Sequence, residues 1–116
     1  MYYNETIIDH FRNPRHIGEL ADANGVGTIG DPACGDFLRI YVRLEGDVIR
    51  DISFLCQGCP AAIASGSATC ELALGKTIHE AAHITDDIVS DYLGGLPGEK
   101  VHCSNLGVAA LRYALA

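Results

Sequence analysis

The sequence has few positive charges and no long apolar run. Eight Lys and Arg residues stand against 15 Asp and Glu residues, which gives a formal net charge of −7 at pH 7. A general nucleic-acid surface needs clustered positive charge, so the composition argues against one. No segment approaches the roughly 20 consecutive apolar residues that a membrane span requires. We therefore expect partners that are engaged locally, with neither nucleic acid nor a membrane among them.

The sequence also lacks the features of a secreted protein. Its first residues, Met1 to Glu5, contain neither the basic segment nor the apolar stretch of a signal peptide. Five cysteines are an odd number. Without a secretion signal, such a set favours metal binding or thiol chemistry over a disulfide framework. We expect a cytoplasmic protein with reduced thiols.

Length and composition predict one folded unit. The chain has 116 residues, and 48% of them are hydrophobic, which is ample for one buried core. The sequence shows no internal repeat, low-complexity tract or linker. We expect residues 1–116 to form a single domain.

The first helix is predicted over residues 2–12. Apolar side chains recur there at helical spacing, and Asn13-Pro14 ends the pattern. The charged cluster on its other side is expected to be a solvated face, with a docking surface as the functional alternative. The expected apolar face consists of Ile7, Ile8 and Phe11, and the expected polar face carries Asp9, His10 and Arg12.

The clearest predicted element is a β-hairpin. Residues 37–44 alternate apolar and basic side chains, a short turn follows, and residues 48–55 return. An antiparallel hairpin brings its two outer ends to the same edge of a sheet. Cys34 and Asp36, just before the first strand, are therefore expected to lie near Cys59, just after the second.

The rest of the chain predicts four helices and a weak first strand. Pro60 suits the first helical position, so Cys59 is the expected N-cap of a helix that Gly75 closes. A thiol at this place faces the positive end of the helix dipole, which favours the thiolate that metals need. The helices are predicted at residues 61–74, 77–82, 85–93 and from Ser104 onward, the last with Leu106, Ala109, Ala110 and Tyr113 on one side; the weak strand is predicted around Val26 and Ile29.

The five cysteines differ in their context. Cys34, Cys59 and Cys103 each sit beside Gly, Pro or a helix start, where the backbone can expose a sulfur, and we expect them to be ligands. Cys70 lies eleven residues beyond Cys59 in the same predicted helix and is expected to be a small core residue. Cys56 forms a C-x-x-C with Cys59, which leaves a redox pair, half of a zinc site or an alternative ligand open. No βαβ pattern surrounds this motif, which argues against a thiol–disulfide oxidoreductase.

Asp36 and His102 are the natural fourth and fifth ligands beside the three cysteines. Carboxylate and imidazole bind iron through harder, less strongly donating atoms than thiolate. A cluster completed by one of them should be held less firmly than by four cysteines. The same donors would also bind Zn²⁺ tetrahedrally. The other histidines and two serines are expected to be surface or packing residues: His10, His16, His79, His83, Ser65 and Ser67.

At these residues the sequence resembles the IscU/NifU family of iron–sulfur cluster assembly scaffolds, and more closely the N-terminal scaffold domain of NifU-type proteins. The resemblance runs along nearly the whole chain, and four motifs in the right order carry it. They are Asp9-His10-Phe11-Arg12-Asn13-Pro14-Arg15 with Gly18, Ala33-Cys34-Gly35-Asp36, Gly58-Cys59-Pro60-Ala61-Ala62-Ile63-Ala64-Ser65 with Gly75-Lys76, and Leu96-Pro97-Gly98-Glu99-Lys100-Val101-His102-Cys103-Ser104.

The resemblance implies an α+β fold with a three-stranded antiparallel sheet packed against several helices. It implies a scaffold rather than an enzyme, on which a labile [2Fe–2S] cluster is built from iron and persulfide sulfur. A cysteine desulfurase would supply the sulfur, and iron–sulfur acceptor proteins would receive the cluster. The family's ligands fall on Cys34, Asp36, Cys59, His102 and Cys103, with Cys103 as the sulfur acceptor and Lys100 close to it in sequence.

Some features bear on partners and on the rival function. The family usually has two prolines where this chain has Pro97 followed by Gly98 and Glu99, which leaves recognition by an Hsp70-type chaperone open. The rival is a zinc-dependent sulfur-transfer protein of the SufU type, which uses the same fold. That group lacks a His before its last cysteine and carries an insertion, so His102 and the short chain argue against it.

Overall fold

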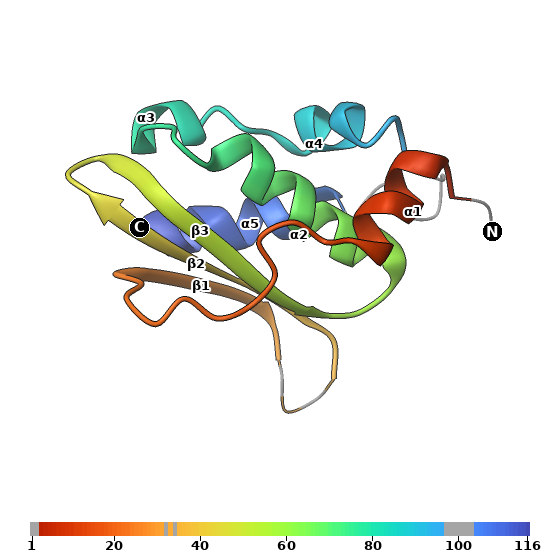
Figure 1. Cartoon of the computed structure of the whole chain (residues 1–116), viewed down its shortest axis with the longest axis horizontal. Coiled ribbons are helices and arrows are strands. Elements are labelled where there is room, and N and C mark those ends of the chain that lie inside the picture. Colours follow the sequence, from red (N-terminus) through yellow and green to blue (C-terminus); the bar gives the residue numbers. More distant parts are fainter. Residues whose placement is uncertain (1–2, 32, 34, 97–103) are drawn as a thin grey trace.

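A three-stranded sheet covered by helices is seen in the computed structural model, which describes residues 3–31, 33, 35–96 and 104–116 (Figure 1). Strands and helices form one packed body, so the expected α+β class is confirmed. The elements are α1 (Glu5–Arg12), β1 (Gly25–Gly30), β2 (Phe37–Glu45), β3 (Val48–Gln57), α2 (Pro60–Ala73), α3 (Ile78–Ala81), α4 (Asp86–Tyr92) and α5 (Ser104–Leu115).

The sheet has the order β1-β2-β3, and both pairs of neighbours are antiparallel. The predicted hairpin is therefore confirmed, and so is the weak first strand. Gly46 has a φ of +64° in the two-residue turn between β2 and β3, a conformation that glycine adopts without strain. At the other end of the hairpin Phe37 is in register with Gln57. This pairing sets side by side the two segments that carry predicted ligands.

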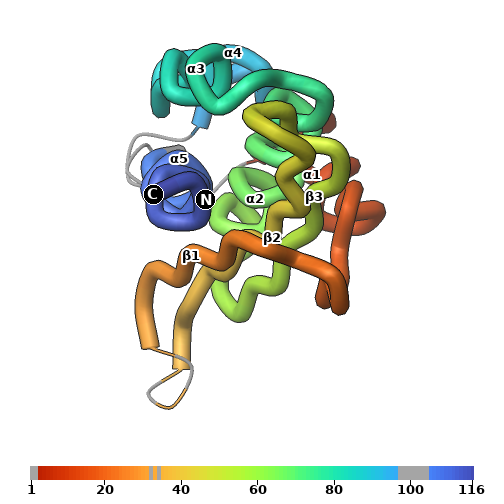
Figure 2. Tube along the Cα trace, turned by 90° about the vertical axis from the view of Figure 1, so that its left-hand side faces the viewer, coloured from red at the N-terminus to blue at the C-terminus, as the bar shows by residue number. Residues whose placement is uncertain are grey.

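The helices form two further layers above one face of the sheet (Figures 1 and 2). α2 and α5 pack directly on the strands, and α4 packs on α2 and α5. The core between the layers is fully buried and includes Phe54, Ile40, Val108 and Leu111. In the described ranges no helix is long and apolar enough to cross a membrane.

α5 lies so close to β1 that the strand needs a glycine at the contact. A Cβ atom built on Gly27 would overlap the carbonyl oxygen of Ala110. Any larger residue would push the helix away from the sheet. This close approach fixes the position of α5, and with it Leu106 near the start of that helix.

The predicted helix starts are largely confirmed. Cys59 is the N-cap of α2 and Pro60 its first residue, while Thr77 and Thr85 cap α3 and α4 with their side chains. Ser104 differs from the prediction by one position, because it is the first residue of α5 rather than the residue before it.

The predicted faces of the first and last helices are partly wrong. In α5, Tyr113 is 63% exposed, whereas Val108 and Leu111 are buried because the helix packs on α2 and α4 as well as on the sheet. In α1, Ile7 is buried as predicted, but Ile8 and Phe11 are exposed. His10, predicted on the polar face, is only 4% exposed. α1 therefore packs through a narrow stripe formed by Ile7 and His10, one turn apart.

Candidate metal-binding site

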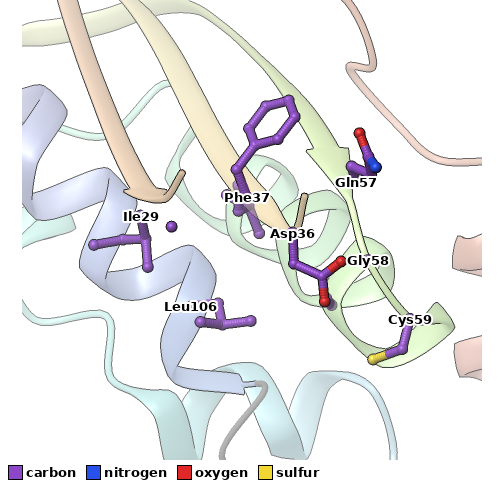
Figure 3. Close-up of a pocket in the computed structure, with 10 residues that line it drawn as sticks. Ile29, Asp36, Phe37, Gln57, Gly58, Cys59 and Leu106 are labelled. Atoms are coloured by element: carbon purple, nitrogen blue, oxygen red, sulfur yellow. The ribbon is translucent and has the colours of Figure 1, made fainter. Parts of the chain in front are cut away.

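A cavity of about 340 Å³ opens at the end of the sheet away from the hairpin turn (Figure 3). Strand ends, the start of α2 and the start of α5 all contribute to it. Among the described residues, Asp36 and Cys59 are the predicted ligands that line it. The other lining residues are Ile29, Gly30, Phe37, Leu38, Gln57, Gly58, Ala62 and Leu106.

The hairpin register explains why these two ligands meet. Asp36 directly precedes Phe37, and Cys59 follows Gln57 by two residues, while Phe37 and Gln57 are paired across the strands. The carboxylate of Asp36 and the sulfur of Cys59 are both seen at the edge of the cavity in Figure 3. Asp36 is exposed and Cys59 half-buried, so an ion arriving from solvent can reach both. The prediction that the hairpin gathers Asp36 and Cys59 is confirmed.

The local backbone places Cys59 at the start of a helix. Its φ of −74° and ψ of 165° are the extended values of an N-cap residue, and Pro60 begins the helix behind it. The positive end of the helix dipole therefore lies next to this residue. A sulfur that binds a metal ion from this position would therefore lie at the start of α2.

The wall of the cavity is apolar and comes from several elements. Ile29 of β1, Leu38 of β2, Ala62 of α2 and Leu106 of α5 line it. Apolar walls keep the local dielectric low, which strengthens the attraction between anionic ligands and a cation. The cavity thus has an oxygen donor and a sulfur donor at its rim and a largely apolar wall.

Three of the five predicted ligands lie outside the described residues: Cys34, His102 and Cys103. Within the described ranges, no three His, Cys, Asp or Glu residues gather closely enough to hold a metal ion. The five-residue ligand set is therefore still a prediction. Of its members, the structure describes Asp36 and Cys59, and both line the cavity.

The other two cysteines lie away from the cavity lining. Cys70 is fully buried, and burial raises the pKa of its thiol well above the usual range, so it remains a neutral thiol. The prediction that it belongs to the core is confirmed. Cys56 is half-buried on β3 in register with Leu38 and packs against the core.

A buried polar contact beneath α1 was not predicted from the sequence. The Nδ1 atom of His10 lies 2.7 Å from Oγ of Ser67, and the same hydroxyl oxygen accepts a hydrogen bond from the Arg15 backbone at 2.9 Å. The edge of the His10 ring meets Tyr92 of α4, with ring centroids 5.7 Å apart. Burial, and next the charge of Arg15, hold the pKa of His10 below its usual value. The spacing of His10 three residues after Ile7 was the available signal that it faces α2.

Comparison with known proteins identifies the family of this chain. Residues 2–116 match the family described as the NifU-like N terminal domain. The chain belongs to the IscU/NifU family of iron–sulfur cluster assembly scaffolds. It is 52% identical to the iron–sulfur cluster assembly scaffold protein IscU 1 of Archaeoglobus fulgidus, over 97% of this chain and 74% of that protein. It is 47% identical to the IscU scaffold of Aquifex aeolicus, over 97% of this chain and 73% of that protein.

Solved structures of IscU/NifU relatives agree with the fold. A candidate assembly scaffold for the SUF system from Fervidobacterium islandicum superimposes with a TM-score of 0.79 at 25% identity, covering 98% of this chain and 96% of that one. The N-terminal part of a NifU-like protein from Brucella abortus gives a TM-score of 0.78 at 19% identity, with 97% and 90% covered. Its identity is so low that it supports the fold alone. IscU proteins are scaffolds and not enzymes.

Proposed function

We propose that this IscU/NifU-type chain assembles a labile [2Fe–2S] cluster in the cavity that Asp36 and Cys59 line, and then passes the cluster to acceptor proteins. The observation that carries the proposal is the meeting of a carboxylate and an N-cap thiol in one apolar-walled cavity. The cluster is cargo here, which is built and released, and the proposed site must therefore bind it without holding it permanently.

Chain connectivity supports the proposed participation of the remaining cysteines. Cys34 precedes Asp36 by two residues, and Cys103 precedes Leu106 by three. A chain spans at most about 7 Å over two residues and about 11 Å over three. Asp36 and Leu106 both line the cavity. Cys34 and Cys103 are thus tethered within reach of it, and His102 is the neighbour of Cys103.

The mixed donor set explains why the cargo could leave. Thiolates bind iron strongly, whereas a carboxylate or imidazole donates less and exchanges more readily. Asp36 is exposed at the rim, where an incoming ligand from an acceptor protein could replace it. We expect Asp36→Cys to retain its cluster longer than the wild type when an apo-ferredoxin is offered as acceptor, which absorbance after separation of the two proteins measures.

The proposed sulfur route uses Cys103 as the acceptor. Its thiolate attacks the outer sulfur of a desulfurase persulfide, so that a new S–S bond forms on Cys103 and the desulfurase cysteine leaves as a thiolate. Reducing two such sulfurs to sulfide takes four electrons. Two ferrous ions that become ferric supply two electrons, and an external reductant supplies the other two. The proposed partners are therefore a cysteine desulfurase, a reductant and iron–sulfur acceptor proteins, in the cytoplasm, with a chaperone still open.

Anaerobic reconstitution tests the proposal. The protein is incubated with ferrous iron, sulfide and thiol, then desalted. We expect visible charge-transfer absorbance with equal amounts of bound iron and sulfide, and loss of this absorbance in Cys34→Ser and Cys103→Ser. A colourless product, or variants that reconstitute as well as the wild type, would reject the assembly function.

Zinc-dependent sulfur transfer is the second candidate, because the thiol of Cys59 and the carboxylate of Asp36 at the cavity are donors that Zn²⁺ also binds. The same cysteines and Asp36 could hold Zn²⁺ in tetrahedral geometry. Stoichiometric zinc that iron cannot displace, together with stimulation of a cysteine desulfurase, would favour this function over cluster assembly.

A further inference from the structure

Two histidines lie one turn apart on the short helix α3 and its C-terminal turn. His79 and His83 are four residues apart, and both are exposed. Residues at this spacing share one side of a helical turn. Neither histidine takes part in the cavity or in the packing of the core.

The two rings have the separation of imidazoles that share a metal ion. Their centroids are 5.0 Å apart and their planes meet at 71°. With metal–nitrogen bonds of about 2.0–2.1 Å, two imidazoles on one ion have centroids about 4.5 Å apart at a right angle and about 5.2 Å apart at a tetrahedral angle. The observed spacing falls between these values, so the two rings already lie at a separation that one ion could bridge.

A hydrogen bond prepares one of these rings as a ligand. Nδ1 of His83 lies 2.9 Å from the backbone carbonyl oxygen of His79. Because a carbonyl only accepts, Nδ1 of His83 carries the proton, and the lone pair of the neutral ring is on Nε2. Metal-binding histidines in proteins commonly donate their other ring nitrogen to a carbonyl in this way. Among the described residues His79 makes no side-chain hydrogen bond or ion pair, so its ring nitrogens are available.

The pair lies far from the cavity. α3 is attached to the turn end of the hairpin, where the backbone N–H of Ile78 donates to the carbonyl of Asp47 at 2.7 Å and Val48 forms a β-bridge with Thr77. The cavity is at the other end of the same strands. The nine residues of β2 separate the two ends by about 26 Å at 3.3 Å per residue. Metal binding at one place can therefore be measured separately from the other.

We propose that His79 and His83 form a surface site for one divalent transition-metal ion that prefers imidazole ligands, with water in the remaining positions. Cu²⁺, Ni²⁺ and Zn²⁺ fit this site better than Fe²⁺, because imidazole complexes strengthen along that part of the first transition series. Glu80 stands between the two histidines but is held in a capping box with Thr77, so the two imidazoles are the ligands.

The test uses the untagged full chain on immobilised Ni²⁺, whose chelating support leaves two adjacent positions open. We expect the wild type to be retained and to elute with imidazole. His79→Gln and His83→Gln should each lose retention, because removing one arm of a two-point attachment weakens binding about a hundredfold. His16→Gln, a histidine that faces Glu71, and Cys59→Ser should elute with the wild type.

Other outcomes would overturn the site. Equal retention of the wild type and both glutamine variants would show that these histidines do not bind the ion. Loss in only one of the two variants would mean a single histidine and no shared ion. Circular dichroism of each variant checks that it is folded, and retention lost in Cys59→Ser would assign nickel binding to the cavity instead.

Discussion

Cys59 and Cys70 belong to the same helix but have opposite surroundings. Cys59 caps the start of α2, is half-buried and lines the cavity. Cys70 lies three turns later, is fully buried, and has its pKa raised by burial. The comparison shows that the start of a helix can place a thiol at a cavity, whereas the middle of the same helix buries a cysteine as a small apolar side chain. We expect this division to show most strongly in cluster loading and less strongly in alkylation and unfolding.

The largest expected difference is in cluster loading. Cys59→Ser should lose nearly all of the visible absorbance after anaerobic reconstitution, because a serine hydroxyl is a poor substitute for a thiolate on iron. Cys70→Ala should load as well as the wild type, since Cys70 does not line the cavity. Equal loading of the two variants would show that Cys59 does not bind the cluster in a way that Cys70 does not.

Thiol alkylation should separate the same residues by rate. In the apo protein at neutral pH, iodoacetamide should modify Cys59 at least about a hundredfold faster than Cys70, because thiolate is the reacting form and burial raises the pKa of Cys70. Peptide mass spectrometry after timed quenching measures both rates in one sample. Unfolding in urea should bring the two rates together, which serves as the control.

For the free energy of unfolding we expect the opposite order, with a larger effect of substitution at Cys70 than at Cys59. Cys70→Ser places a hydroxyl in a fully buried apolar position and should lower the free energy of unfolding by about 2 kcal/mol. Cys59→Ser should change it by less than about 0.5 kcal/mol, because a serine is a good N-cap residue. Urea unfolding of the apo proteins measures both. If Cys59→Ser lowered the free energy of unfolding more than Cys70→Ser, the conclusion that Cys70 is the cysteine that stabilises the packing would be wrong.

The smallest expected effect comes from His10, which contacts the buried middle of α2 through Ser67. The pKa of His10 is lowered in the fold, so the unfolded chain takes up a proton more readily than the folded one. Stability should therefore be full above about pH 6.5, the pKa of an unfolded histidine, and should fall as the pH drops toward the lower folded value. Urea midpoints at pH 7.5 and 5.5 should show this loss in the wild type and less of it in His10→Gln. A pH dependence unchanged in that variant would contradict the assignment.

Local chemistry in the sequence was enough to predict much of the fold and the cavity. The alternation in residues 37–44 and 48–55 gave the hairpin, and hairpin geometry alone put Asp36 near Cys59. Pro60 marked the start of α2, so the N-cap role of Cys59 also followed. The burial of Cys70 could also be predicted, because it lies well inside an apolar helix.

The faces of α1 and α5 could not be predicted from periodicity alone. A helical pattern indicates which residues lie on the same face of a helix. Which face is buried depends on the elements that pack against the helix in the complete fold. His10 is buried because Ser67, more than fifty residues later, supplies a partner for its ring. Tyr113 is exposed because α5 packs against helices as well as the sheet. Both corrections depend on contacts between distant segments.

The most direct test of the proposed site is X-ray absorption at the iron edge of the anaerobically reconstituted protein. Cluster assembly in the cavity predicts two irons that share sulfide, with further sulfur ligands and at least one oxygen or nitrogen ligand. Iron surrounded only by oxygen and nitrogen, or with no second iron nearby, would contradict the account.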